Sequence, residues 1–154
     1  MKELTLKEII EYAIKIEKES YSFYKKAENI VDDQNVKKLL ILLANEEIDH
    51  QNRLLVLIDE EIVSAKELEK KRDVNISLME SIIATSNIVE NCSSREVLKI
   101  ALEREKNTEQ SYSMLLTLSD ISEEIVNIFD ELRLQEKGHV QKIQNRINNL
   151  TSIK

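Results

Sequence analysis

Four glutamates and two histidines stand where amphipathic helices would otherwise place apolar side chains. The only two histidines of this 154-residue chain each follow a glutamate by three positions, in the tetrads EIDH and EKGH. That spacing puts both side chains on one face of a helix. Carboxylate and imidazole groups are suitable ligands for iron or manganese. The pattern predicts a metal site made of Glu17, Glu47, His50, Glu105, Glu136 and His139.

The composition limits the fold to helices. The chain has one glycine and no proline, so it lacks the residues that hairpin turns and sandwich corners need. Start signals and apolar periodicity predict four long helices, at residues 6–31, 34–60, 94–118 and 122–150. Short turns join the helices within each pair, and a connector at residues 61–92 joins the pairs. We expect one all-α domain over residues 1–154, an antiparallel four-helix bundle with one long crossover.

Pairs of residues with capping-box spacing mark the predicted helix starts. They are Thr5/Glu8, Ser93/Glu96, Asp120/Glu123 and, for a short helix inside the connector, Ser64/Glu67. The connector also contains a largely apolar stretch at residues 76–89.

The four glutamates should lie at one height in the bundle. Glu17 and Glu47 are equidistant from the turn at residue 32, and Glu105 and Glu136 are equidistant from the turn near residue 120. Residues equidistant from the turn of an antiparallel hairpin lie side by side. About 15 helical residues separate each glutamate from its turn, so the layer should lie roughly 22 Å away from the turns.

Four carboxylates in an apolar core cannot remain free anions, because desolvation and mutual repulsion would raise their pKa values or unfold the bundle. Two divalent cations would balance the four charges. One Glu from each of two helices, with Glu-x-x-His from the other two, is the ligand set of di-iron bundles. The ligand types also admit a manganese–iron pair or zinc.

The two halves of the chain repeat each other. AIKIEKESYSFY (13–24) aligns with ALEREKNTEQSY (101–112) at an offset of 88, and LLANEEIDHQNRL (42–54) aligns with ELRLQEKGHVQKI (131–143) at an offset of 89. The repeat carries both E-x-x-H tetrads and a motif E-x-x-[S/T]-x-x-x-Y, found at Glu17/Ser20/Tyr24 and Glu105/Thr108/Tyr112.

By these motifs the chain resembles the rubrerythrin-like branch of the ferritin-like superfamily, the di-iron carboxylate proteins. The resemblance implies a ferritin-like bundle with two iron ions. It further implies terminal ligands at Glu17 and Glu105, bridging ligands at Glu47 and Glu136, and one histidine for each metal, His50 and His139. Tyr24 and Tyr112 would lie just outside the ligands and are the candidate catalytic side chains.

The resemblance also implies an oxidoreductase that reduces hydrogen peroxide or oxygen. Typical rubrerythrins have a further glutamate three residues after the ligand that corresponds to Glu105, where this chain has Thr108. They also have a cysteine-rich rubredoxin domain, whereas this chain has only Cys92. The likeness is thus to single-domain members that use an external electron donor. Two alternatives stay open, an iron-handling ferroxidase or storage protein and a metal-stabilised module that binds a partner.

Other features set expectations for partners and location. The net charge of −7 and the lack of a Lys/Arg cluster argue against nucleic acid. The longest apolar run has six residues, against the ~20 that a membrane span needs. No signal-peptide pattern is seen at the N-terminus, so we expect a cytoplasmic protein. The second helix is apolar nearly all round at residues 39–43 and 54–58, which predicts a homodimer interface, with cover by the connector as the alternative.

Three acidic residues near the candidate ligands lie off the core faces of the predicted helices. Glu46, Asp49 and Glu103 are predicted to lie on solvated faces.

Gly138, the only glycine, stands next to His139, and a mid-helix glycine costs about 1 kcal/mol relative to alanine. We therefore expect close packing or a local helix distortion at Gly138.

Overall fold

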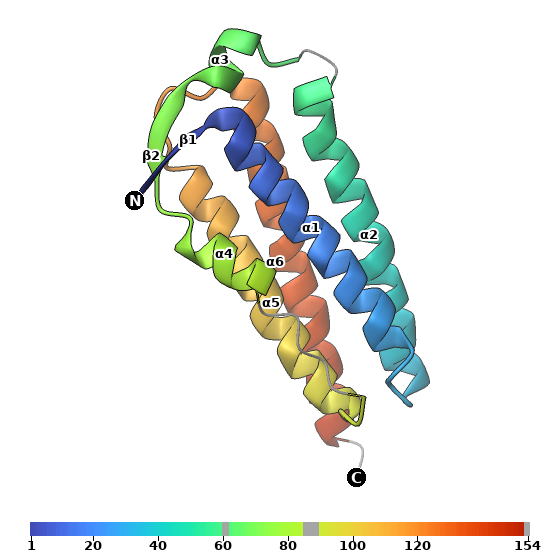
Figure 1. The fold of residues 1–154 in the computed structure, drawn as a ribbon. Coiled ribbons are helices and arrows are strands. Elements are labelled where there is room, and N and C mark those ends of the chain that lie inside the picture. Colours follow the sequence, from blue (N-terminus) through green and yellow to red (C-terminus); the bar gives the residue numbers. More distant parts are fainter. Residues whose placement is uncertain (60–61, 85–89, 153–154) are drawn as a thin grey trace.

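Four long helices form an elongated bundle (Figure 1) in a computed structural model that describes residues 1–59, 62–84 and 90–152. The helices are α1 (Leu6–Glu28), α2 (Gln34–Asp59), α5 (Ser94–Leu115) and α6 (Glu123–Ser152). α1 packs against α2 and α5 packs against α6, each pair as an antiparallel hairpin. The short turns therefore produce the two antiparallel hairpins that the sequence predicts.

Two of the four predicted pairs, those at the starts of α1 and α5, form complete capping boxes. The Thr5 hydroxyl accepts a hydrogen bond from the Glu8 amide (3.1 Å), and the Glu8 carboxylate accepts one from the Thr5 amide (3.0 Å). Ser93 and Glu96 make the same reciprocal pair at the start of α5, with both distances 3.1 Å. Each box satisfies amides that the first helical turn leaves without partners.

The long connection between the hairpins has structure of its own. It contains α3 (Ala65–Glu69), β2 (Lys71–Val74) and α4 (Ser77–Ala84), and β2 pairs antiparallel with β1 (Lys2–Thr5) at the N-terminus. The predicted short helix is α3, and α4 is the described part of the apolar stretch, of which residues 85–89 lie outside the described residues. The two strands were not predicted, because four-residue strands from distant segments leave no periodic pattern.

Two helices end three residues before their predicted ends, α1 at Glu28 and α5 at Leu115. After α5 the chain makes tighter turns, with the Thr117 amide bonded to the Met114 carbonyl and the Leu118 amide to the Leu115 carbonyl. These three-residue bonds satisfy carbonyls of the last helical turn without continuing the α-helix.

The start of α6 also differs from the prediction. Asp120 does not cap the helix, because it has a left-handed backbone (φ 58°) and its carboxylate lies 3.4 Å from the Lys70 ammonium. The helix begins at Glu123, and the amide of Ser122 donates instead to the Glu67 carboxylate of α3 (2.6 Å). A negative charge from another element thus supports this helix N-terminus.

The apolar core is divided into two clusters. One includes Leu6, Ile10, Leu57 and Phe129, and the other includes Ala27, Leu40, Leu98 and Ile143. The buried polar side chains come from the middle of the same helices. Among the described residues, no helix combines the length and the apolar character that a bilayer crossing requires.

The prediction for Gly138 is wrong. The residue is exposed within regular α6, its φ is not positive, and an added Cβ would meet nothing within 4 Å. Each helical residue turns the side-chain direction by about 100°, so a position one residue before His139 and two after Glu136 faces away from both. Proximity in sequence to these residues does not place Gly138 near them in the core.

Because there is space for a methyl group, Gly138→Ala should stabilise the protein. The expected gain is about 0.5–1 kcal/mol, since alanine has the higher helix propensity and restricts the unfolded chain. Urea unfolding of the metal-free protein measures it, with Lys137→Ala on the same exposed turn as the control. A loss of stability in Gly138→Ala would mean that the backbone here needs glycine after all.

Candidate metal centre

Each long helix contributes one glutamate to a polar layer between the two apolar clusters. The six sequence-predicted residues all lie there, and each is 2% exposed or less. They come from α1 (Glu17), α2 (Glu47, His50), α5 (Glu105) and α6 (Glu136, His139). The layer exists because the glutamates of each hairpin are equidistant from its turn.

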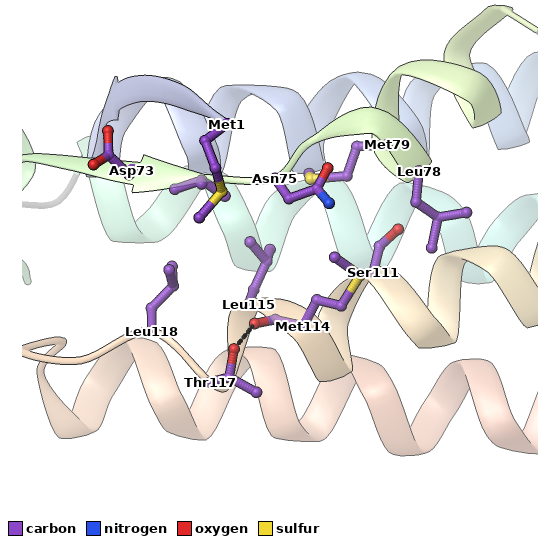
Figure 2. A pocket seen from close by; sticks show the side chains of 11 residues that line it. Met1, Asp73, Asn75, Leu78, Met79, Ser111, Met114, Leu115, Thr117 and Leu118 are labelled. Atoms are coloured by element: carbon purple, nitrogen blue, oxygen red, sulfur yellow. Dashed lines mark hydrogen bonds between the residues drawn. The ribbon is translucent and has the colours of Figure 1, made fainter.

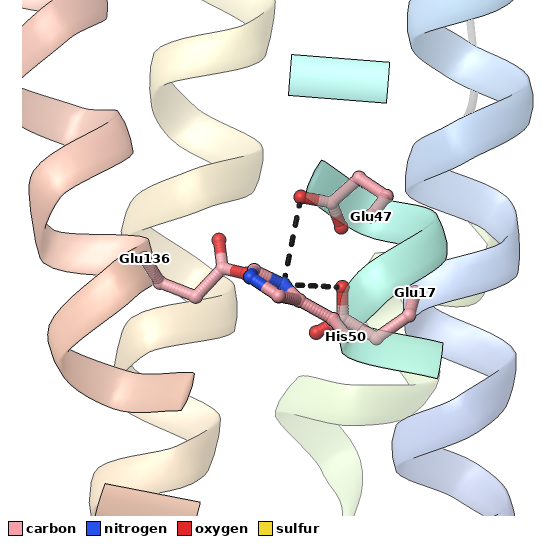
Figure 3. A group of neighbouring side chains, drawn as sticks. All are labelled: Glu17, Glu47, His50 and Glu136. Carbon is pink, nitrogen blue, oxygen red and sulfur yellow. Dashed lines mark hydrogen bonds and ion pairs between the residues drawn. The ribbon is translucent and has the colours of Figure 1, made fainter. Parts of the chain in front are cut away.

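The ligand atoms divide into two groups that share two residues. In each group, the candidate ligand atoms all lie within 4.8 Å of one another. One group is Glu17, Glu47, His50 and Glu136, shown in Figure 3, and the other is Glu47, Glu105, Glu136 and His139. Glu47 and Glu136 belong to both groups. The geometry is that of two adjacent cation positions with two shared carboxylates.

Both histidines present Nδ1 to the carboxylates. The His50 Nδ1 lies 3.0 Å from Glu136 Oε1 and 3.2 Å from Glu17 Oε2. The His139 Nδ1 lies 3.4 Å from Glu136 Oε2 and 3.5 Å from Glu105 Oε2. The two rings are stacked, with centroids 5.5 Å apart and planes inclined by 12°. Nδ1 is therefore the nitrogen that each ring would offer to a metal.

Two tyrosines connect the halves of the bundle at this layer. The Tyr24 hydroxyl of α1 donates to the Glu105 carboxylate of α5, and the Tyr112 hydroxyl of α5 donates to Glu17 of α1 at 2.7 Å. Each tyrosine thus bonds the unshared glutamate of the opposite repeat. Burial, followed by the nearby carboxylate charges, raises both tyrosine pKa values well above 10, so the hydroxyls remain donors.

The pKa shifts of the clustered side chains indicate that the layer requires positive charge. Burial raises the pKa of Glu47 well above its usual value, and the charges of Glu17 and Glu136 raise it further. Burial alone would lower the histidine pKa values, but the surrounding carboxylates outweigh it and raise them to about 10 for His50 and about 9 for His139. When no cation is bound, protons on Glu47 and the two histidines therefore balance the negative charge of the buried carboxylates.

Several buried atoms in the layer accept or donate no hydrogen bond. Within the described residues they include Glu47 Oε1, Glu105 Oε2, both oxygens of Glu136 and Nδ1 of His139. An unsatisfied buried polar atom costs about 1–3 kcal/mol, and more when it is charged. These atoms all belong to the two candidate groups, so the donor set fits metal ions.

Comparison with known proteins agrees with this geometry. A profile of the Rubrerythrin family matches residues 8–147. The chain belongs to the rubrerythrin family. A crystal structure from Thermotoga maritima, provisionally described as a ferritin-like diiron-carboxylate protein, aligns with a TM-score of 0.73 and 21% identity over 96% of this chain and 97% of the other. That likeness shows a ferritin-like fold. No curated protein matches the chain.

Two further residues of this rubrerythrin-family site, Glu46 and Gln135, were missed by sequence reasoning. Glu46, predicted on a solvated face, instead accepts a hydrogen bond from His139, and Gln135 accepts one from His50 at 2.6 Å. Glu46 and Gln135 are 89 residues apart, which is the offset of the internal repeat. The repeat is the one sequence signal that could have indicated that the two residues occupy equivalent positions.

A cavity elsewhere in the fold offers different chemistry. It has a volume of about 190 Å³ and lies beside β2, α4 and the end of α5 (Figure 2). Its lining is mainly apolar and includes Met1, Met79 and Met114, and among the described residues that line it Asp73 is the one acidic side chain. The carboxylate and imidazole ligands are concentrated in the bundle layer, which is therefore the candidate metal centre.

The metal-free protein should become more stable when Glu47 is replaced by glutamine. Glutamine removes a desolvated carboxyl group that adjoins Glu17 and Glu136, and we expect a gain of about 1–3 kcal/mol at pH 7. Because the folded-state pKa of Glu47 is raised, the gain should shrink as the pH falls and disappear below 4.5, where the carboxyl is protonated in both the folded and the unfolded protein.

Urea unfolding with a chelator present measures this change, and Glu103→Gln on the exposed face of α5 is the matched control, with an expected effect within 0.5 kcal/mol. A less stable Glu47→Gln protein at pH 7 would contradict the charge-burial argument.

Proposed function

We propose that the polar layer holds two iron ions. The observation that carries the proposal is the division of the ligand atoms into two groups with Glu47 and Glu136 in common. These two residues would bridge the ions, and Glu17 with His50 and Glu105 with His139 would complete the two positions. Four carboxylates balance the charge of two divalent ions, which matches the need for positive charge in this layer.

We further propose that the protein is an oxidoreductase that reduces hydrogen peroxide or oxygen. Bound as Fe(II), the two ions would supply one electron each, which with two protons converts hydrogen peroxide into two water molecules. The carboxylates would hold the ions in position, and the hydroxyls of Tyr24 and Tyr112 would keep the unshared glutamates oriented. The apolar clusters on both sides would restrict water at the centre.

An external donor would return the electrons. A rubredoxin-type donor site is cysteine-rich, whereas this sequence has one cysteine, Cys92, which is a free, half-buried thiol. A cytoplasmic location remains a prediction. A ferroxidase or storage role uses the same ligands and differs in what happens to the oxidised iron. A module that only binds a partner would need the ions for folding and not for reaction.

The reaction is tested by anaerobic stopped-flow mixing of the di-ferrous protein with hydrogen peroxide. Iron oxidation should be faster than for the same concentration of free Fe(II) by about tenfold or more, a barrier difference of about 1.4 kcal/mol. Glu136→Gln should lose iron at both positions and abolish the acceleration, because both oxygens of Glu136 serve the two groups. Glu103→Gln should retain two ions and the full rate.

Oxidation no faster than that of free iron, in protein that holds two ions, would exclude the oxidoreductase. Retention of the oxidised iron inside large soluble protein particles would favour the storage role.

We propose a second copy of this chain as a partner. Ile41 and Ile48, seven residues apart on one face of α2, are 41% and 40% exposed, and Leu134 on α6 is 51% exposed. The described elements of the crossover include α3, which contacts α1, and α4, which contacts α1 and α5. These apolar side chains therefore remain available for a homodimer.

Light scattering of the metal-loaded protein should give the mass of two chains. Ile48→Glu should shift the protein to monomers, because it buries a charge in the proposed contact. The control Glu103→Gln, on the exposed face of α5, should remain dimeric. A wild-type particle with the mass of one chain would contradict the dimer.

A further inference from the structure

The two histidines differ at the ring nitrogen that faces away from the candidate ligands. The Nε2 of His50 donates to Oε1 of Gln135, a neutral amide, at 2.6 Å. The Nε2 of His139 donates to Oε2 of Glu46, a carboxylate. The two imidazoles otherwise have similar surroundings, since each is nearly fully buried and presents Nδ1 to carboxylates.

Glu46 and Gln135 occupy corresponding positions of the internal repeat. They are 89 residues apart and immediately precede Glu47 and Glu136. Each side chain crosses between α2 and α6 to reach the histidine of the other repeat. The arrangement of side chains in the layer is therefore nearly two-fold symmetric. The formal charge of the residue that accepts from Nε2 is not, because Glu46 is an anion and Gln135 is neutral.

The nature of this outer partner affects how strongly a histidine binds a metal. When Nδ1 binds an ion, the ring proton must be on Nε2. A carboxylate that accepts this proton in a hydrogen bond increases the basicity of the ring, and loss of such a partner typically lowers metal affinity about 10- to 100-fold. An amide oxygen is a weaker acceptor, because the bond it makes is not charge-assisted.

The surroundings of Glu46 allow it to act in this way. Its side chain is 34% exposed, so its charge is tolerated at the edge of the layer. The Lys142 ammonium lies 3.7 Å from Oε1, the oxygen that does not accept from His139. The carboxylate is thus held between a lysine on its outer side and the imidazole on its inner side.

We propose that Glu46 is a positioning residue that makes the two metal positions unequal. It acts through His139, so that the ion beside His139 and Glu105 is bound more tightly and fills before the ion beside His50 and Glu17. The inference rests on the proposed binding of two ions, but it does not depend on which reaction they perform.

Affinity for Co²⁺ in single-histidine backgrounds tests the proposal. His50→Ala retains the position beside His139, and His139→Ala retains the position beside His50, so each variant reports one position. The first should bind Co²⁺ more tightly than the second in chelator competition. Adding Glu46→Gln should weaken Co²⁺ binding about 10- to 100-fold in the His50→Ala background and leave the His139→Ala background within threefold.

The reciprocal substitution provides the matched control. Gln135→Glu should strengthen binding in the His139→Ala background and leave the His50→Ala background unchanged. A merely structural role for Glu46 would lower affinity in both backgrounds, and that result, or no effect in either, would overturn the proposal. Failure of the wild-type protein to bind two Co²⁺ ions would instead overturn the proposed function.

A second measurement avoids the alanine variants, which could fold poorly. Because the chain has only two histidines, ¹⁵N-histidine labelling of the Zn²⁺-loaded protein gives one pair of ring signals for each position. Glu46→Gln should move the Nε2 signal of His139 and leave that of His50 in place. Equal movement of both signals, or of neither, would contradict an action through His139.

Discussion

Four carboxylates buried between two apolar layers are the feature on which the other parts of this structure depend. Each charge is costly in such surroundings unless positive charge lies within a few ångströms. A bundle of long helices accommodates this layer well, because helices satisfy their own backbone groups and leave only side chains to be paired. The apolar clusters on both sides keep bulk water from substituting for the missing positive charge.

The tyrosine hydroxyls add a second constraint, on the alignment of the hairpins. Tyr24 and Tyr112 bond glutamates of the opposite half, in both directions. Sliding one hairpin along the other by a helical turn would break both bonds and leave two buried carboxylate oxygens without donors. The tyrosines therefore hold the two halves in the register that brings all four glutamates to one height.

Much of this arrangement could be predicted because it follows from helical periodicity and hairpin geometry. The position of Glu17 or Glu136 in the core depends only on spacing along a helix and distance from a turn. Glu46 was not predicted as part of the site, because it lies one residue before the core face of its helix. It contacts the site through its hydrogen bond with the His139 ring, which depends on how that ring is oriented. The β1–β2 pair escaped too, since pairing between distant short strands depends on the finished bundle. Gly138 was misjudged because nearness in sequence was taken for nearness in space.

The internal repeat has a consequence for what such a centre can become. A dimer of identical hairpins would place the same residue behind both histidines, because symmetry makes every position occur twice. Joining two hairpins in one chain, through the crossover that contains α3, β2 and α4, releases positions 46 and 135 from that identity. One half can then acquire a carboxylate while the other retains an amide. The covalent link between the hairpins is thus what allows a symmetric scaffold to hold two chemically different neighbours.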